Sequence, residues 1–140
     1  MRGLPPTVRG TPQDGSEWIA IGNRWDPEYS GPRPWSEPET RTVRRLVKNL
    51  KPELTIWYHQ PQTLVRAWGQ SVPMARKFAR FSNMDFAKIR WPHGTAPNWQ
   101  NHRFPGTSSF VVELAAGPLS ERKANRQAYA VMRLARSLSN

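Results

Sequence analysis

Apolar residues recur at intervals of three and four in several stretches of the chain, and each stretch predicts an amphipathic helix. The first helix is expected to begin at Ser36. A serine cap with Glu39 three residues later forms a capping box, and proline is tolerated in the first turn. Pro52 is expected to end this helix. Its apolar positions are Val43, Leu46, Val47 and Leu50.

Two further helices are predicted downstream. Residues 73–81 combine helix-forming residues with an apolar face of Met74, Phe78 and Phe81. The last helix is expected to span residues 121–137 after the capping residue Ser120. Its apolar stripe is expected to pack against another element. The stripe consists of Ala124, Ala128, Val131, Ala135 and Leu138.

Two short apolar runs predict buried strands. The first covers residues 54–58, and His59 follows it just before Pro61 stops the strand. The second covers residues 110–114 and carries the carboxylate of Glu113. The order helix, strand, helix, strand, helix predicts an α/β fold in which a sheet is flanked by helices.

The remaining segments are less regular. Residues 89–91 predict a short strand, whereas the pattern over residues 62–69 is ambiguous, and Trp68 within them is expected to be buried. Residues 92–106 contain several prolines and glycines and predict a loop. Residues 1–24 are predicted to form an irregular N-terminal segment, with the folded domain over residues 25–140.

Composition excludes several classes of protein. The chain has 140 residues, of which 37% are hydrophobic and seven are tryptophan, so it can build a core. The absence of cysteine excludes disulfides, a cysteine-ligated zinc site and a thiol nucleophile. No apolar run approaches the ~20 residues of a membrane span. The N-terminus lacks the apolar region of a signal peptide, so the chain as written is expected to stay in the cytoplasm.

A formal charge of +11 attracts polyanions in general. The arginines are spread over several segments and do not form one tract or one helix face. This distribution favours a solvated basic surface, and neither nucleic acid nor a membrane is expected as a partner.

His59 and Glu113 are the two residues whose positions in the sequence suggest a chemical role. Ligands of open α/β sheets bind at the carboxyl ends of strands, so His59 could be a metal ligand, an acid or base, or a hydrogen-bonded core histidine. A carboxylate within an apolar strand is costly to bury unless it is paired. Glu113 could therefore be a general base or could form an ion pair with one of the arginines.

The absence of several known motifs limits the chemical roles open to His59 and Glu113. The chain contains no H-x-x-E or H-E-x-x-H metal motif, no G-x-S-x-G nucleophile turn and no glycine-rich phosphate loop. The other histidines, His93 and His102, show no ligand-like spacing. A catalytic zinc needs three protein ligands, which these histidines alone do not supply.

Several segments taken together resemble a known family. In order they are S-G-P-R-P-W-S-E-P-E-T at residues 30–40, I-W-Y-H-Q-P at 56–61, G-T-A-P-N-W at 94–99 and F-V-V-E-L at 110–114. They are similar to the C-terminal portion of zinc carboxypeptidases of the carboxypeptidase A type, and most similar to the bacterial branch that includes murein peptide amidases. The resemblance runs from Trp25 to the C-terminus and makes residues 25–140 a partial domain of this type.

The resemblance implies a role for each matching residue. His59 corresponds to a zinc ligand, and Glu113 to the catalytic glutamate that takes a proton from the attacking water and returns it to the leaving amine. Asn98 and Trp99 fall where the family contacts substrate. The implied cofactor is zinc, and the implied substrate is a peptide or muropeptide.

The chain also departs from the family. The H-x-x-E motif, which supplies two further zinc ligands, is missing, so the chain is expected to be inactive alone. It is expected either to need its missing N-terminal half or to self-associate through the uncovered edge of its sheet. The alternatives are a non-catalytic basic module that binds peptidoglycan or nucleic acid, and a product without function.

Overall fold

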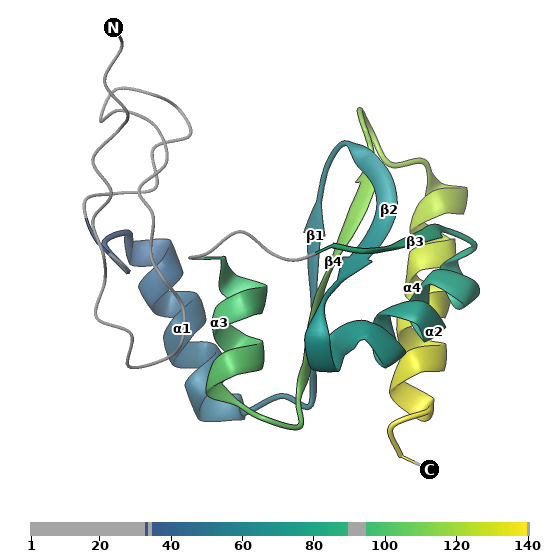
Figure 1. Cartoon of the computed structure of the whole chain (residues 1–140). Coiled ribbons are helices and arrows are strands. Elements are labelled where there is room, and N and C mark those ends of the chain that lie inside the picture. The colour runs from purple at the N-terminus through teal and green to yellow at the C-terminus, as the bar shows by residue number, and fades with distance from the viewer. Residues whose placement is uncertain (1–32, 34, 90–94, 140) are drawn as a thin grey trace, which may run out of the picture.

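A mixed β-sheet of four strands lies at the centre of the protein, and helices cover both of its faces (Figure 1). The computed structural model describes residues 33, 35–89 and 95–139. The elements, in chain order, are α1 (Pro38–Leu50), β1 (Leu54–His59), β2 (Gln62–Ala67), the 3-10 turn η1 (Gly69–Ser71), α2 (Val72–Ser82), β3 (Asp85–Lys88), α3 (Ala96–Arg103), β4 (Ser108–Ala115) and α4 (Glu121–Arg136).

The strands lie in the order β1-β4-β2-β3. β1 runs parallel to β4, β2 runs antiparallel to β4, and β3 runs parallel to β2. The predicted strands at residues 54–58 and 110–114 are thus confirmed as β1 and β4, and they are neighbours in the sheet. Their register sets His59 directly beside Glu113.

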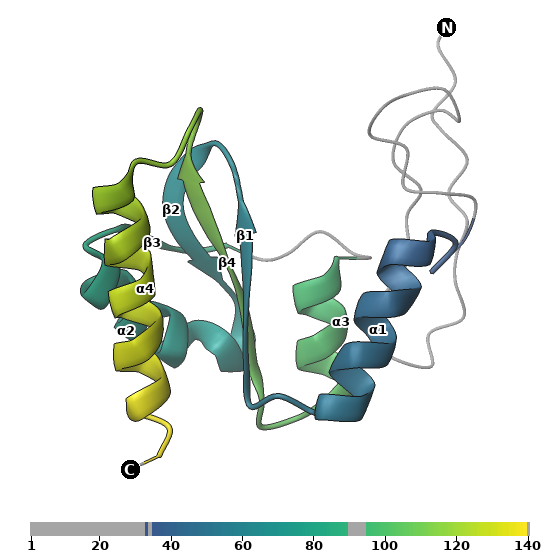
Figure 2. The ribbon, with the colours of Figure 1, turned by 180° about the vertical axis from the view of Figure 1, so that it is seen from behind.

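Alternation along the strands gives the sheet two chemically different faces. On the apolar face, Phe110 and Val112 are completely buried, and Val65 lies beside Val112. This face packs against α2 and α4, which lie together on one side of the sheet (Figures 1 and 2). The rings of Phe78 and Phe110 meet there with centroids 5.7 Å apart. Burial on this face supplies the main hydrophobic stabilisation of the fold.

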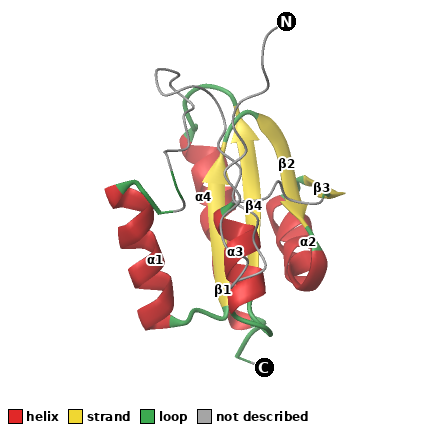
Figure 3. Cartoon of the chain, turned by 60° about the vertical axis from the view of Figure 1, so that its left-hand side comes forward, coloured by secondary structure: helices red, strands yellow, loops and turns green. Residues whose placement is uncertain are grey.

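The polar face carries His59 and Glu113 and lies toward α3, on the side opposite α2 and α4 (Figure 3). The side-chain amide of Asn101 donates to the Ser109 carbonyl and accepts from the Ser109 N–H, both at 2.9 Å. These contacts satisfy backbone groups of β4 beyond the last residue that pairs with β2. α3 is thereby fixed against the same face as the two candidate functional residues.

α3 itself corrects the expectation of a loop over residues 92–106. It occupies Ala96–Arg103, while residues 92–94 lie outside the described part of the chain. Pro97 is tolerated because it falls within the first turn. The segment has almost no helical amphipathicity. Its helix is held by polar contacts such as Gln100 Nε2 donating to Thr55 Oγ1 at 2.7 Å, which no periodicity reveals.

The expected burial of Trp68 was wrong. Residues 62–69, whose pattern was ambiguous, contain the strand β2, and Trp68 just after it is 41% exposed, with the Lys88 ammonium 5.1 Å from its ring centroid. A further strand that the sequence did not predict, β3, occupies Asp85–Lys88. Ile89 follows β3, and residues 90 and 91 lie outside the described part, so the short strand expected at residues 89–91 stays a prediction.

α1 and α2 confirm the helices predicted there, but the start of α1 differs from the prediction. Glu37, rather than Ser36, is the N-cap residue, and no side chain caps the helix. The Ser36 hydroxyl instead donates to Glu37 Oε1 at 2.9 Å, so the expected capping box with Glu39 is absent. Of the apolar residues of α1, only Val47 is buried, whereas Leu46 and Leu50 are 56% and 67% exposed.

α4 confirms a helix capped by Ser120, whose hydroxyl accepts from the Lys123 N–H at 3.4 Å. The predicted apolar stripe was only partly right: Ala124 and Leu138 are half-buried, but the helix buries a neighbouring face most deeply. Ala130 and Leu134 are completely buried against the core. The exposed members of the predicted stripe are Ala128, Val131 and Ala135. Within the described ranges, no helix combines the length and apolarity needed to cross a bilayer.

We expect the Leu134→Ala substitution to lower the free energy of unfolding by about 2–5 kcal/mol, because it opens a cavity at a completely buried position. Leu46→Ala is the matched control, and a change within about 0.5 kcal/mol is expected because that side chain is 56% exposed. Urea denaturation followed by circular dichroism measures both. Equal losses in the two variants would contradict the assignment of the core.

We also expect the chain to self-associate. Within the described residues, no strand pairs with the outer edge of β1, and α1 exposes Leu46 and Leu50. Open edges and exposed apolar side chains favour association. Sedimentation velocity over a hundredfold range of concentration should show a rising mean mass, which Leu46→Lys with Leu50→Lys should reduce. A single monomeric species at every concentration, with a concentration-independent thermal transition, would exclude this behaviour.

A candidate metal and acid–base site

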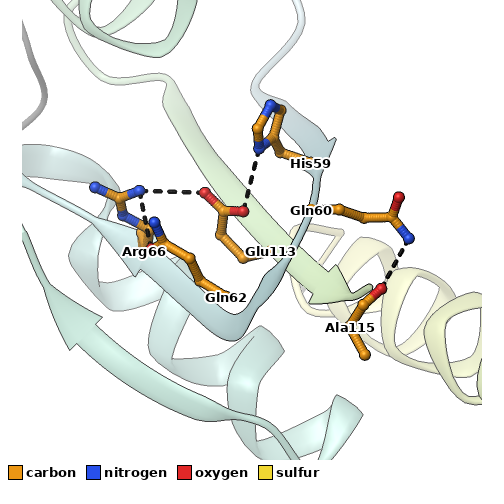
Figure 4. Close-up of polar contacts among 6 residues, drawn as sticks. All are labelled: His59, Gln60, Gln62, Arg66, Glu113 and Ala115. Atoms are coloured by element: carbon orange, nitrogen blue, oxygen red, sulfur yellow. Dashed lines mark hydrogen bonds and ion pairs between the residues drawn. The ribbon is translucent and has the colours of Figure 1, made fainter. Parts of the chain in front are cut away.

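The end of β1 brings an imidazole against a buried carboxylate. His59 Nδ1 lies 3.2 Å from Glu113 Oε2, and the two residues are direct neighbours on parallel strands (Figure 4). The His59 side chain is 73% exposed, whereas that of Glu113 is only 5% exposed. The imidazole is therefore open to solvent, whereas the carboxylate beside it is not.

A third residue completes the cluster. Arg66 on β2 donates from Nη1 to Glu113 Oε1 at 3.1 Å, and the same nitrogen lies 3.2 Å from Gln62 Oε1 (Figure 4). An arginine partner for Glu113 was one of the alternatives left open by the sequence, but Arg66 was not singled out. Its position opposite Val111 on the neighbouring strand β4 becomes visible only once residues 62–67 are recognised as a strand.

Each oxygen of Glu113 thus has one partner. Arg66 supplies a full positive charge, which offsets the cost of burying the carboxylate. A neutral His59 can supply an Nδ1–H donor to the other oxygen. In that tautomer the lone pair lies on Nε2, which points away from Glu113 (Figure 4). A carboxylate that fixes the tautomer in this way is a common arrangement behind metal-binding histidines.

The turn after β1 helps to hold His59 in place. Gln60 donates from Nε2 to the Ala115 carbonyl at 2.8 Å and to the Gly117 carbonyl at 2.9 Å. These bonds tie the turn between β1 and β2 to the end of β4 (Figure 4). Nearby, partial burial raises the pKa of the Tyr58 phenol above its usual value of about 10. That phenol is therefore protonated and neutral at physiological pH.

Asn98 and Trp99 lie on α3 rather than in a loop. Trp99 is 4% exposed and packs edge-on against Trp35, with ring centroids 4.9 Å apart, and against Phe104 at 6.0 Å. Asn98 is half-buried. Among the described residues, no hydrogen bond joins either of them to His59 or Glu113. Their role in binding substrate therefore stays a prediction, and the packing of Trp99 gives that side chain a structural role.

The side chains around His59 fall short of what a zinc centre requires. A catalytic zinc takes three protein ligands and keeps one position open. Within the described ranges no three His, Cys, Asp or Glu side chains gather closely enough to hold a metal ion. His59 supplies one suitable nitrogen, and Arg66 already occupies one oxygen of Glu113. The described residues fit one ligand of a zinc centre and not a whole centre, so no catalytic step through a metal follows from them.

Comparisons with known proteins identify the fold. Neither a protein-family model nor a curated protein sequence matches the chain. Among solved structures, it matches the murein-tripeptide amidase MpaA from Escherichia coli O157, with a TM-score of 0.55 and 19% identity over 79% of this chain. It also matches the carboxypeptidase A from Helicoverpa armigera, with a TM-score of 0.64 and 14% identity over 78% of this chain.

The matches extend over part of those proteins only. They cover 44% of the amidase and 36% of the carboxypeptidase. The chain therefore has an α/β fold that corresponds to part of a carboxypeptidase-type fold, as its sequence predicted. At these levels of identity the likeness concerns the arrangement of helices and strands.

Replacing Arg66 should reveal its contribution to this cluster. We expect Arg66→Met to lower the free energy of unfolding by about 2–4 kcal/mol, because it leaves Glu113 buried without its cation while Arg66 itself is only partly exposed. The double variant Arg66→Met/Glu113→Leu should recover at least half of this loss. Chemical denaturation of the single and double variants measures the coupling. Additive losses would show that the two side chains do not act as a pair.

Proposed function

We propose that the chain is a portion of a zinc peptidase of the metallocarboxypeptidase type, acting on a peptide or a muropeptide, and that it is inactive alone. The observation that carries the proposal is the contact between His59 and Glu113 at neighbouring positions of two parallel strands. In open α/β sheets the carboxyl ends of parallel strands are where ligands bind. The partial match to a murein-tripeptide amidase and a carboxypeptidase A supports the substrate class.

In this proposal His59 is one ligand of the zinc. When bound, a zinc ion would polarise the scissile carbonyl and activate water. Glu113 is the general base, because its carboxylate lies beside the imidazole and is shielded from bulk solvent. To accept a proton from water, Oε2 would exchange its contact with His59 Nδ1 for one with that water, since both carboxylate oxygens are engaged in this structure. Arg66 keeps that carboxylate in one orientation by holding Oε1, which leaves Oε2 on the side of His59.

The remaining zinc ligands must come from elsewhere. Two more protein ligands are needed. They would be supplied by residues outside the described ranges or by another polypeptide that joins the open edge of β1. His59 ends β1 at that edge of the sheet, so a strand added there would run beside the imidazole. This is why activity is expected only after the sheet has been completed.

Zinc binding tests the proposal. We expect Zn²⁺ added to the metal-free chain to shift the ring ¹⁵N resonances of His59 before those of the other histidines. The binding should be weak, because one protein ligand cannot hold the ion tightly. Zinc measured by elemental mass spectrometry after gel filtration should fall well below one per chain. No hydrolysis of peptides or muropeptides is expected. His59→Ala assigns the resonances, and His102→Ala serves as the matched control.

Two results would oppose the proposal in different ways. If Zn²⁺ leaves the His59 resonances unchanged while those of other histidines shift, His59 is not a metal ligand. If the purified chain holds close to one zinc that is lost in His59→Ala, the site is already complete, and the chain should be assayed as a working enzyme.

A further inference from the structure

A pocket of about 600 Å³ lies beside β3, at the opposite edge of the sheet from His59. α2 and β3 border it; the two elements lie next to each other in Figure 1. Phe86 lies beside Val65 and thus on the apolar face, whereas Glu113 belongs to the polar face. The sheet therefore separates this pocket from the candidate metal site. It is lined by Arg76, Ala79, Arg80, Asn83, Met84 and Phe86.

The rim of the pocket is positively charged and uncompensated. Arg76 and Arg80 stand one helical turn apart on α2, and both are exposed. Neither forms an ion pair with any described residue, and no carboxylate lines the pocket. Like charges at this spacing repel each other. An anion bound between the two guanidinium groups would relieve that repulsion and accept hydrogen bonds from both.

The rim is also partly ordered before any ligand binds. The Arg76 guanidinium lies over the Phe86 ring, 5.1 Å from its centroid. Asn83 ends α2 in a left-handed conformation, and its side-chain amide makes no hydrogen bond with the described residues. That amide provides a further donor beside the arginines. The negative end of the α2 dipole, equivalent to roughly half a charge, opposes an anion here, but two arginines outweigh it.

The floor of the pocket is apolar. Ala79 is 3% exposed, and Met84 and Phe86 are half-buried. Gln127 of α4 donates to the Met84 sulfur at 3.3 Å and so holds this side chain against α4. The space available to a ligand is about 600 Å³ and is largely open to solvent, and it far exceeds the needs of inorganic phosphate. The pocket therefore suits a ligand with an apolar body as well as an anionic group.

We propose that this pocket binds a small organic anion in which a phosphate or carboxylate group is joined to a flat aromatic ring system, as in a nucleoside monophosphate. Arg76 and Arg80 hold the anionic group, and Asn83 supplies an additional donor. The ring rests on Met84, beside the Phe86 ring that the Arg76 guanidinium covers. The inference stands independently of the peptidase proposal, because the two sites share no residue and lie on opposite faces of the sheet.

The test uses the whole chain and AMP as the probe, with adenosine and inorganic phosphate as separate arms. Chains labelled with ¹³C at the methionine methyl groups are titrated and followed by NMR. AMP should shift the Met84 signal, whereas Met132, which is 57% exposed on the outside of α4, should stay unchanged. Adenosine and phosphate should each bind at least tenfold more weakly than AMP, since adenosine lacks the anionic group and phosphate lacks the ring system.

Variants assign the binding to the two arginines. Arg76→Gln and Arg80→Gln should each weaken AMP binding about five- to tenfold, the loss typical of an exposed charge-assisted contact. Arg126→Gln removes the same charge from an exposed position on α4 and should leave the affinity unchanged. All the altered side chains are exposed, so the variants should fold, which circular dichroism checks.

Three results would overturn the proposal. The first is an unchanged Met84 signal at millimolar AMP. The second is a loss of affinity in Arg126→Gln as large as in the pocket variants. The third is binding of a single-stranded oligonucleotide that far exceeds binding of AMP and is insensitive to Arg76→Gln and Arg80→Gln. That last result would assign anion binding to the basic surface as a whole.

Discussion

The cost of burying one carboxylate governs the polar half of this molecule. Glu113 lies in the interior of the sheet with 5% of its side chain exposed, and a charge at such depth is tolerated only with partners. β2 brings Arg66 to one oxygen, and β1 brings His59 to the other. The apolar face of the same strands needs no such matching, because α2 and α4 cover it with interlocking side chains. The sheet is thus a partition between a hydrophobic core and a charged cluster.

The sequence predicts those parts of this arrangement that depend on local residue patterns, and not those that depend on contacts between distant strands. Residues 54–58, 73–81 and 110–114 have local patterns strong enough to predict β1, α2 and β4. The proximity of His59 and Glu113 was expected from the family resemblance alone. The periodicity of each strand fixes which face a side chain takes but not which strand lies next to it. Register between residues so far apart is a property of the folded sheet.

The features that the sequence did not predict also depend on contacts between distant parts of the chain. α3 is stabilised by hydrogen bonds from Gln100 and Asn101 to distant strands, and such contacts leave no trace in local hydrophobicity. In α4 two adjacent stripes are both apolar, so composition alone cannot tell which one meets the core, and the structure buries Ala130 and Leu134. Arg66 escaped notice because its significance depends on the strand opposite. Tertiary contacts decided each of these cases.

The pairing of β1 with β4 also determines when the fold can form. The contact between His59 and Glu113 spans 54 positions of sequence, and the segment between them includes β2, α2, β3 and α3. Closing so large a loop lowers the entropy of the chain before any stabilising contact forms. This order of events slows folding. During synthesis β1 leaves the ribosome long before its only described strand partner. The nascent chain therefore carries an unpaired strand for that interval, and this is when a chaperone or a premature association would have its greatest effect.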